Sequence, residues 1–116
     1  MPTIKGKTYR NNDEIADLGT LIEGSYSDAI DVRGCDIVAF QFSITNIGTD
    51  VTITLELSLD GTNYANYSYD GSNYTVTAAG NVILYFEACR AITYARASYV
   101  SQTGGTPTVA VKVKVV

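Results

Sequence analysis

Residues 51–74 read VTITLELSLDGTNYANYSYDGSNY and begin with nine residues in which apolar and polar side chains alternate. The apolar set is Val51, Ile53, Leu55, Leu57 and Leu59. Because successive side chains of a β-strand point to opposite faces, this pattern predicts a strand with one buried and one solvated face. Asp60-Gly61 then supplies the turn dipeptide of a tight hairpin, since both residue types tolerate the positive φ angles it needs.

The end of this strand is copied ten residues later. SLDGTNY at 58–64 and SYDGSNY at 68–74 share Ser, Asp, Gly, Asn and Tyr in register. Two hairpin turns in succession predict a meander, with a more exposed strand over 62–69 and a third strand over 72–79.

Alternation recurs along the rest of the chain, over 36–46, 82–87, 91–100 and 108–116. Residues 15–34 are ambiguous, because Gly19 and Gly24 interrupt an apolar spacing; we expect irregular structure or one short strand, then a strand near 28–32. In total we expect about eight strands, with turn residues between them and no long helix. This predicts an all-β fold, an antiparallel β-sandwich that is jelly-roll-like. Strands that are polar on one face argue against an all-parallel sheet.

Length and composition favour one domain. The chain has 116 residues, of which 46% are hydrophobic, enough for a single core without metals or disulfides. Residues 1–14 are mostly polar and lack a period, so we expect an N-terminal arm, followed by a single β-sandwich domain over 15–116. Ile4, Tyr9 and Arg10 are the arm residues that we expect at an interface if the arm becomes ordered against a partner; fraying at a terminus is the alternative.

The charge pattern argues against two classes of partner. The net charge is −4 and the few basic residues are scattered, whereas nucleic acids and anionic membranes require a clustered basic face. The first residues lack the apolar core of a signal peptide and no segment approaches the length of a membrane span, so we expect a soluble protein made in the cytoplasm. Cys35 and Cys89 lack the CxxC spacing of metal or redox motifs. We expect buried thiols, with a disulfide as the alternative.

The chain offers little for catalysis. It contains no histidine, which removes the commonest general base, the Ser-His-Asp and Cys-His triads and the commonest metal ligand. No nucleophile elbow and no phosphate-binding glycine loop before a helix occurs in the sequence. We therefore expect a protein that is not an enzyme and that needs no cofactor.

Two other features of the copied motif could form sites. Asp60, Asn63, Asp70 and Asn73 are oxygen ligands in two similar loops, so calcium is one interpretation. Asp-Gly and Asn are also what hairpin turns require, and we favour the turn interpretation.

The tyrosines are the more informative group. The chain has nine tyrosines and no tryptophan, and Tyr64, Tyr67, Tyr69 and Tyr74 gather around the two turns. Tyrosine is enriched at protein interfaces and also stacks on sugar rings. Three interpretations stay open: packing at sandwich edges, a protein interface, and a carbohydrate site, against which the missing tryptophan counts.

The sequence resembles small β-sandwich structural proteins of tailed bacteriophages. In that group a hairpin of the type sxDGtnw/y and an ending of the type yxRv…tggTptv recur, and here they match 58–64, 94–96 and 103–115. The resemblance covers about the C-terminal half of the chain. Tyr64 stands where the group often has tryptophan, and the second SYDGSNY copy is unusual.

The resemblance implies a virion location and a structural role. It suggests a capsid decoration or cement protein, with a neck, tail or fibre accessory as a further position, that binds the major capsid protein or other virion proteins. Such proteins act as symmetric homo-oligomers, and a trimer is our expectation. A carbohydrate-binding module that uses the tyrosine cluster for host attachment or glycan binding is the alternative function.

Overall fold

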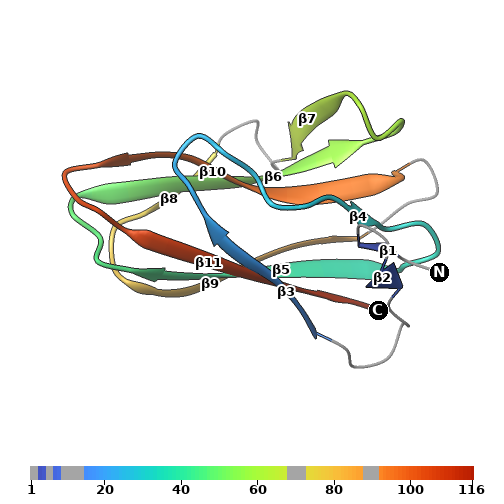
Figure 1. The fold of residues 1–116 in the computed structure, drawn as a ribbon, viewed down its shortest axis with the longest axis horizontal. Coiled ribbons are helices and arrows are strands. Elements are labelled where there is room, and N and C mark those ends of the chain that lie inside the picture. Colours follow the sequence, from blue (N-terminus) through green and yellow to red (C-terminus); the bar gives the residue numbers. More distant parts are fainter. Residues whose placement is uncertain (1–2, 5–6, 9–14, 68–72, 88–91) are drawn as a thin grey trace.

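The described part of the chain consists of strands and the loops that join them. A computed structural model describes all residues except 1–2, 5–6, 9–14, 68–72 and 88–91. Within the described residues, eleven strands form two sheets, which lie one above the other as two layers (Figure 1). β1 and the end of β11 lie at the same end of the sandwich (Figure 1).

The first sheet, sheet A, has β10 and β6 at its centre. Its order is β2 (Lys7–Thr8), β1 (Thr3–Ile4), β4 (Ile30–Asp31), β10 (Tyr94–Thr103), β6 (Asp50–Ser58) and β7 (Tyr64–Tyr67), with β8 (Tyr74–Val76) also on β6. The second sheet, sheet B, is β3 (Ile15–Leu21), β11 (Thr108–Val115), β5 (Ile37–Thr45) and β9 (Gly80–Glu87). All these pairings are antiparallel.

The path of the chain between the sheets is that of a jelly roll. From β3 to β6 each strand lies in the other sheet from the one before it, and the same holds from β8 to β11. Eight strand positions are occupied in chain order by β3, β4, β5, β6, β7 with β8, β9, β10 and β11. The predicted all-β, antiparallel, jelly-roll-like sandwich is confirmed.

The core is formed by the strands whose alternation the sequence displays. On β5, Val38, Phe40, Phe42 and Ile44 are at most 1% exposed. The inward side chains of β6, β10 and β11 meet them from both sheets, and these are Val51, Ile53, Leu55, Ala95, Ala97, Tyr99, Val109, Val111, Val113 and Val115. Burying this apolar surface is the main favourable term in folding.

The strand of residues 51–59 ends one residue earlier than its pattern suggests. Leu59 was expected inside, but β6 ends at Ser58 and Leu59 is 66% exposed. The Ser58 hydroxyl accepts the backbone N–H groups of Asp60 (3.2 Å) and Gly61 (2.8 Å). The Ser58 side chain therefore binds the backbone of the turn, and the strand ends before Leu59.

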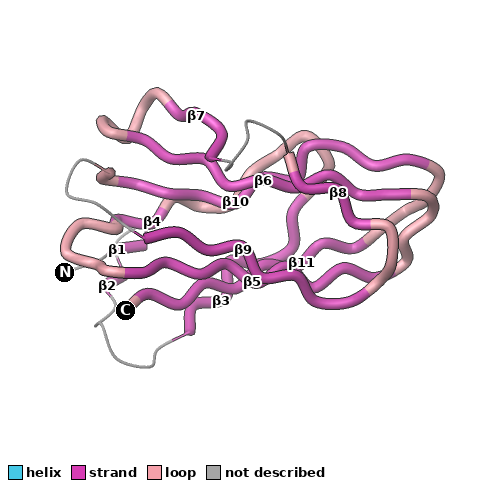
Figure 2. Tube along the Cα trace, turned by 180° about the vertical axis from the view of Figure 1, so that it is seen from behind, coloured by secondary structure: helices cyan, strands magenta, loops and turns pink. Residues whose placement is uncertain are grey.

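The predicted meander is wrong. β7 pairs with Leu55–Ser58 of β6, and β8 pairs with Val51–Ile53 of the same strand. Both are antiparallel to β6, so they run in the same direction and share one edge of sheet A (Figure 2). β7 and β8, which flank the second copy of the motif, therefore pair with β6 and not with each other. Residues 68–72 lie outside the described part.

Residues 15–21 form a full strand in spite of Gly19. The register of β3 with β11 shifts between Val111, opposite Gly19, and Lys112, opposite Asp17, so Leu18 is an extra residue. Gly19 has φ 82°, and its N–H donates to the Asp17 carboxylate at 2.8 Å. The glycine that suggested a break instead forms a β-bulge, and the strand continues through it.

Parts of the predicted arm add to sheet A. The backbone of β1 pairs with β4, with Thr3 opposite Asp31 and Ile4 opposite Ile30. Tyr9 and Arg10 lie outside the described residues. The strand expected near 28–32 is present as β4. Cys35, which follows β4, is 7% exposed, as expected for a buried thiol, and Cys89 lies outside the described part.

Candidate interaction surfaces

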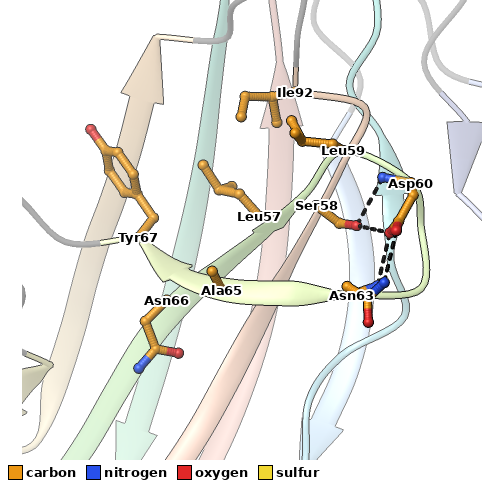
Figure 3. Close-up of a pocket in the computed structure, with 9 residues that line it drawn as sticks. All are labelled: Leu57, Ser58, Leu59, Asp60, Asn63, Ala65, Asn66, Tyr67 and Ile92. Carbon is orange, nitrogen blue, oxygen red and sulfur yellow. Dashed lines mark hydrogen bonds between the residues drawn. The ribbon is translucent and has the colours of Figure 1, made fainter.

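The first copied motif forms a hairpin turn fixed by one carboxylate. Gly61 has φ 79°, and Asp60 Oδ1 accepts the backbone N–H groups of Thr62 (2.9 Å) and Asn63 (2.8 Å). The Asn63 side-chain amide donates to Asp60 Oδ2 at 2.8 Å (Figure 3). These bonds, with the Asn63 backbone bond first, hold the pKa of Asp60 well below its usual range.

The same bonds favour the turn interpretation over calcium. Both oxygens of Asp60 already accept protein donors, and Asn73 Oδ1 accepts the Asn66 amide at 3.2 Å. Asp70 lies outside the described residues. Among the residues that the structure describes, no group of three or more acidic, Cys or His side chains is placed to hold a metal ion.

The tyrosines near the copied motifs lie on two sides of sheet A. Tyr64 pairs with Ser58, whereas Tyr67 pairs with Leu55 and Tyr74 with Ile53. Directly opposite residues share a face, so Tyr67 and Tyr74 lie on the core side of the sheet edge, where the Tyr67 and Phe86 ring centroids are 5.5 Å apart. Tyr64 lies on the outer face. Tyr69 lies outside the described residues.

An arginine joins Tyr64 to a distant tyrosine on the outer face of sheet A. The guanidinium carbon of Arg96 lies 3.7 Å from the ring centroid of Tyr64 and 3.5 Å from that of Tyr26. Arg96 Nε also donates to Glu56 Oε1 at 2.6 Å. Tyr26 reaches this position because its backbone forms a bridge with Ser98, next to Arg96 on the same face. We call Tyr26, Glu56, Tyr64 and Arg96 the arginine stack.

The arginine stack is partly enclosed and continues toward the hairpin turn. The side chains of Arg96 and Glu56 are 17% and 18% exposed, whereas Tyr26 is 56% exposed. Burial raises the pKa of Tyr64, against the smaller opposite effect of Arg96. Tyr94, two residues before Arg96 on the same face, packs against Gly61, where a Cβ would lie 2.9 Å from its ring. The stack therefore belongs to a larger aromatic surface.

Sequence reasoning identified Tyr64 but missed Tyr26, Glu56 and Arg96 as members of one site. Tyr26 is far from the copied motifs, and Arg96 was interpreted only as part of an alternating strand and of the motif at 94–96 that carries the resemblance. The alternation along each strand was the available signal, because it places both Glu56 and Arg96 on the polar face of their strands.

An apolar pocket of about 390 Å³ lies beside the β6–β7 hairpin. Figure 3 shows Leu57, Leu59 and Ile92 gathered on one side of the hairpin. Ala65 and Tyr67 complete its apolar lining. The segments that follow Tyr67 and precede Ile92 lie outside the described residues, so we assign no ligand to this pocket.

The outer face of sheet B carries large exposed apolar side chains. Ile15 on β3, Ile83 and Tyr85 on β9, and Ile37 on β5 are 62%, 58%, 66% and 42% exposed. The lysines of β11 lie between them: Lys112 is opposite Gln41 and Lys114 is opposite Ala39. This face combines apolar edges with a basic centre.

Comparisons with known proteins found no relative. No family model, no curated protein and no solved structure matches this chain. The described part of the chain holds no helix long and apolar enough to cross a membrane.

Proposed function

We propose that this chain is a non-enzymatic virion structural protein of a tailed phage, a capsid decoration protein whose outer sheet A face binds a neighbouring virion protein. The observation that carries the proposal is the arginine stack. Arginine and tyrosine are enriched among the residues that dominate binding energy at protein interfaces.

The stack has the properties of a preorganised binding surface. The two rings and Glu56 hold the Arg96 side chain in one position, so little rotamer entropy remains to be lost when a partner covers it. Glu56 also neutralises the guanidinium, which lowers the cost of removing its charge from water. Tyr26, more than half exposed, offers the apolar area for contact.

The fold is compatible with this role. Jelly rolls recur in viral capsid proteins and also in lectins, so the fold alone is an analogy. A decoration protein present in many copies at symmetric positions gains avidity from individually weak contacts, and a face with a few rigid aromatic anchors supplies such contacts.

The carbohydrate alternative receives less support from the geometry. A sugar platform would use tyrosines on one face, but Tyr64 lies on the outer face of sheet A whereas Tyr67 and Tyr74 lie on its core side. The rings of the arginine stack present their faces to Arg96, which leaves less ring surface for a sugar to stack on.

The test uses particles purified from the native source of the gene. Peptide mass spectrometry and immunogold labelling should find the chain on intact particles. Tyr26→Ala is expected to reduce its incorporation, whereas Tyr74→Ala, which removes a similarly exposed ring from the other side of the sheet, is the matched control. Absence of the chain from particles, together with saturable glycan binding that Tyr67→Ala removes, would favour the carbohydrate alternative.

A second experiment concerns residues 1–14, which include Ile4, Tyr9 and Arg10. If the arm contacts a neighbouring subunit, a variant that begins at residue 15 should lose particle binding and keep the β-type circular dichroism of the sandwich. Unimpaired binding by that variant would show that the arm is not part of the interface.

A further inference from the structure

Edge strand β9 differs from the other sheet edges of the described residues. A sheet edge presents unpaired N–H and C=O groups, and proteins usually protect it by short length, bulges or charges. β2 has two residues, β7 and β8 are short and separated, and β3 carries the bulge at Gly19 and the charge of Asp17. Each of these three edges is a poor template for pairing with another chain.

β9 lacks these protections over Asn81–Phe86, and its charged residue, Glu87, stands at its end. Its eight residues, GNVILYFE, pair with β5 in unbroken register from Glu87 opposite Ile37 to Gly80 opposite Ile44. The segment Asn81–Phe86 contains no charge and no proline, and it is rich in β-branched and aromatic residues. No strand of the described residues pairs with its other side. A long, regular and apolar edge is suited to β-augmentation.

We propose that β9 pairs antiparallel with β9 of a second copy, so that the two B sheets form one continuous eight-stranded sheet. The inference goes beyond the proposed function and does not depend on it. Antiparallel pairing of a strand with itself is a two-fold operation, so it yields a dimer in place of the trimer expected from the sequence.

The register follows from the side-chain pattern of the strand. Directly opposite residues must share a face, and a two-fold axis at Leu84 pairs all seven residues from Asn81 to Glu87. It places Tyr85 of each copy opposite Ile83 of the other, so that two equivalent pairs form, one on each side of the axis. These two side chains are 66% and 58% exposed in the single chain, and aromatic with β-branched pairs are favourable cross-strand neighbours.

The charges fit this register. Glu87, the charged residue of β9, comes to lie opposite Asn81 of the second copy and not opposite another carboxylate. The Ser43 hydroxyl donates to Asn81 Oδ1 at 2.7 Å, which orients the Asn81 amide nitrogen as the donor toward an incoming Glu87. On the core side, the half-buried side chains of Val82 and Leu84 would become more deeply buried in the dimer. A second copy is therefore complementary to this edge in backbone hydrogen bonding, in its cross-strand apolar pairs and in charge.

The test is the mass of the full-length protein, by light scattering and sedimentation, over a concentration series. We expect a reversible dimer and concentration-dependent protection from amide hydrogen exchange in residues 80–87. In the double variant I83K/Y85K, a lysine of one copy lies opposite a lysine of the other in both pairs. Because like charges directly opposite each other are unfavourable, the variant should weaken dimerisation at least about tenfold. Ile15→Lys, on the same face but at the opposite edge of sheet B, is the matched control and should leave it unchanged.

Three results would overturn the inference. They are a monomer at every concentration up to about 1 mM, a dimer in which residues 80–87 gain no protection, and a dimer that Ile15→Lys weakens as much as the double variant. The last result would indicate stacking of two sheet B faces. The hydrogen-exchange measurement on the unaltered protein keeps the test decisive if the double variant fails to fold. Binding to particles plays no part in these measurements, so they stand apart from the test of the proposed function.

Discussion

Arg96 and Glu56 lie directly opposite each other on β10 and β6, and their side chains are joined by a 2.6 Å hydrogen bond on the outer face of sheet A. The pair connects the two central strands of that sheet. Tyr26 and Tyr64 enclose the guanidinium from outside this pair. The site therefore joins the β6–β7 hairpin to two parts of the chain that are distant in sequence, at Tyr26 and at β10.

The arginine stack is expected to stabilise the fold as well as to form a surface. Arg96→Ala should lower the free energy of unfolding by about 2 kcal/mol, because it removes two cation–π contacts and leaves Glu56 partly buried without its partner. Arg96→Lys should recover only part of this loss, since an ammonium lacks the planar guanidinium. Urea unfolding of both variants measures the effect, and equal stability of Arg96→Lys and the unaltered protein would contradict the stacking argument.

The Asp60 turn should contribute to acid sensitivity. The folded-state pKa of Asp60 is depressed, so its contribution to stability is present above the unfolded value of about 4 and is lost as the pH falls below it. Asp60→Asn is expected to flatten the decline of unfolding free energy between about pH 4 and pH 2. Unfolding curves at several pH values test this, and identical pH dependence in both proteins would contradict it.

The Cys35 thiol should be unreactive in the folded protein. Burial first, then the charges of Asp31 and Asp36, raises its pKa to about 11, so little thiolate is present at neutral pH. In a Cys89→Ser background, a thiol reagent at about pH 8 should label the native protein about 100-fold more slowly than the unfolded protein. Equal rates under native and denaturing conditions would show that Cys35 is accessible.

The loops before β6 and after β10 should tolerate no side chain where they meet. A Cβ at Gly48 would overlap the backbone of Gly104, whereas a Cβ at Gly24 would meet no atom within 4 Å. Gly48→Ala should therefore destabilise the protein by more than Gly24→Ala, for which the cost is only the strain of φ +80°, about 1 kcal/mol. Thermal unfolding of the two variants compares these costs, and the reverse order would contradict the close approach.

The elements that alternate strictly could be predicted from the sequence, because one buried face determines both their existence and their orientation. This holds for β5 and β11 and for most of β6. β3 could not be predicted, since the meaning of Gly19 depends on its pairing with Val111 of the distant β11. The second copied motif misled for a related reason: a turn signal does not reveal which strand receives the chain after it.

The candidate site was predicted only in part. Composition suggested tyrosines as candidate interface residues, and of these Tyr64 lies on the outer face of sheet A. The ring partners of Arg96 are Tyr26 and Tyr64, which precede it by 70 and 32 residues in the sequence. No periodicity links positions so far apart, so their meeting depends on the order of strands in the sheet. The open edge of β9 likewise follows from topology, although its apolar character is visible in the sequence.

The jelly-roll path has a consequence for how the chain folds. β11 lies between β3 and β5, and Ile15 pairs with Lys114, so sheet B joins the first and last parts of the described sandwich. Contacts this distant in sequence require large loops to close, and the entropy cost of closure comes before the favourable energy of the contacts. Folding is therefore slow, in the range of milliseconds to seconds typical of such topologies. On the ribosome, β3 and the second edge of β5 have no partner strand in sheet B until β11 emerges, and the apolar edge of β9 is exposed during that wait. The nascent chain is therefore most prone to aggregation just before its synthesis reaches the final strand of the sandwich.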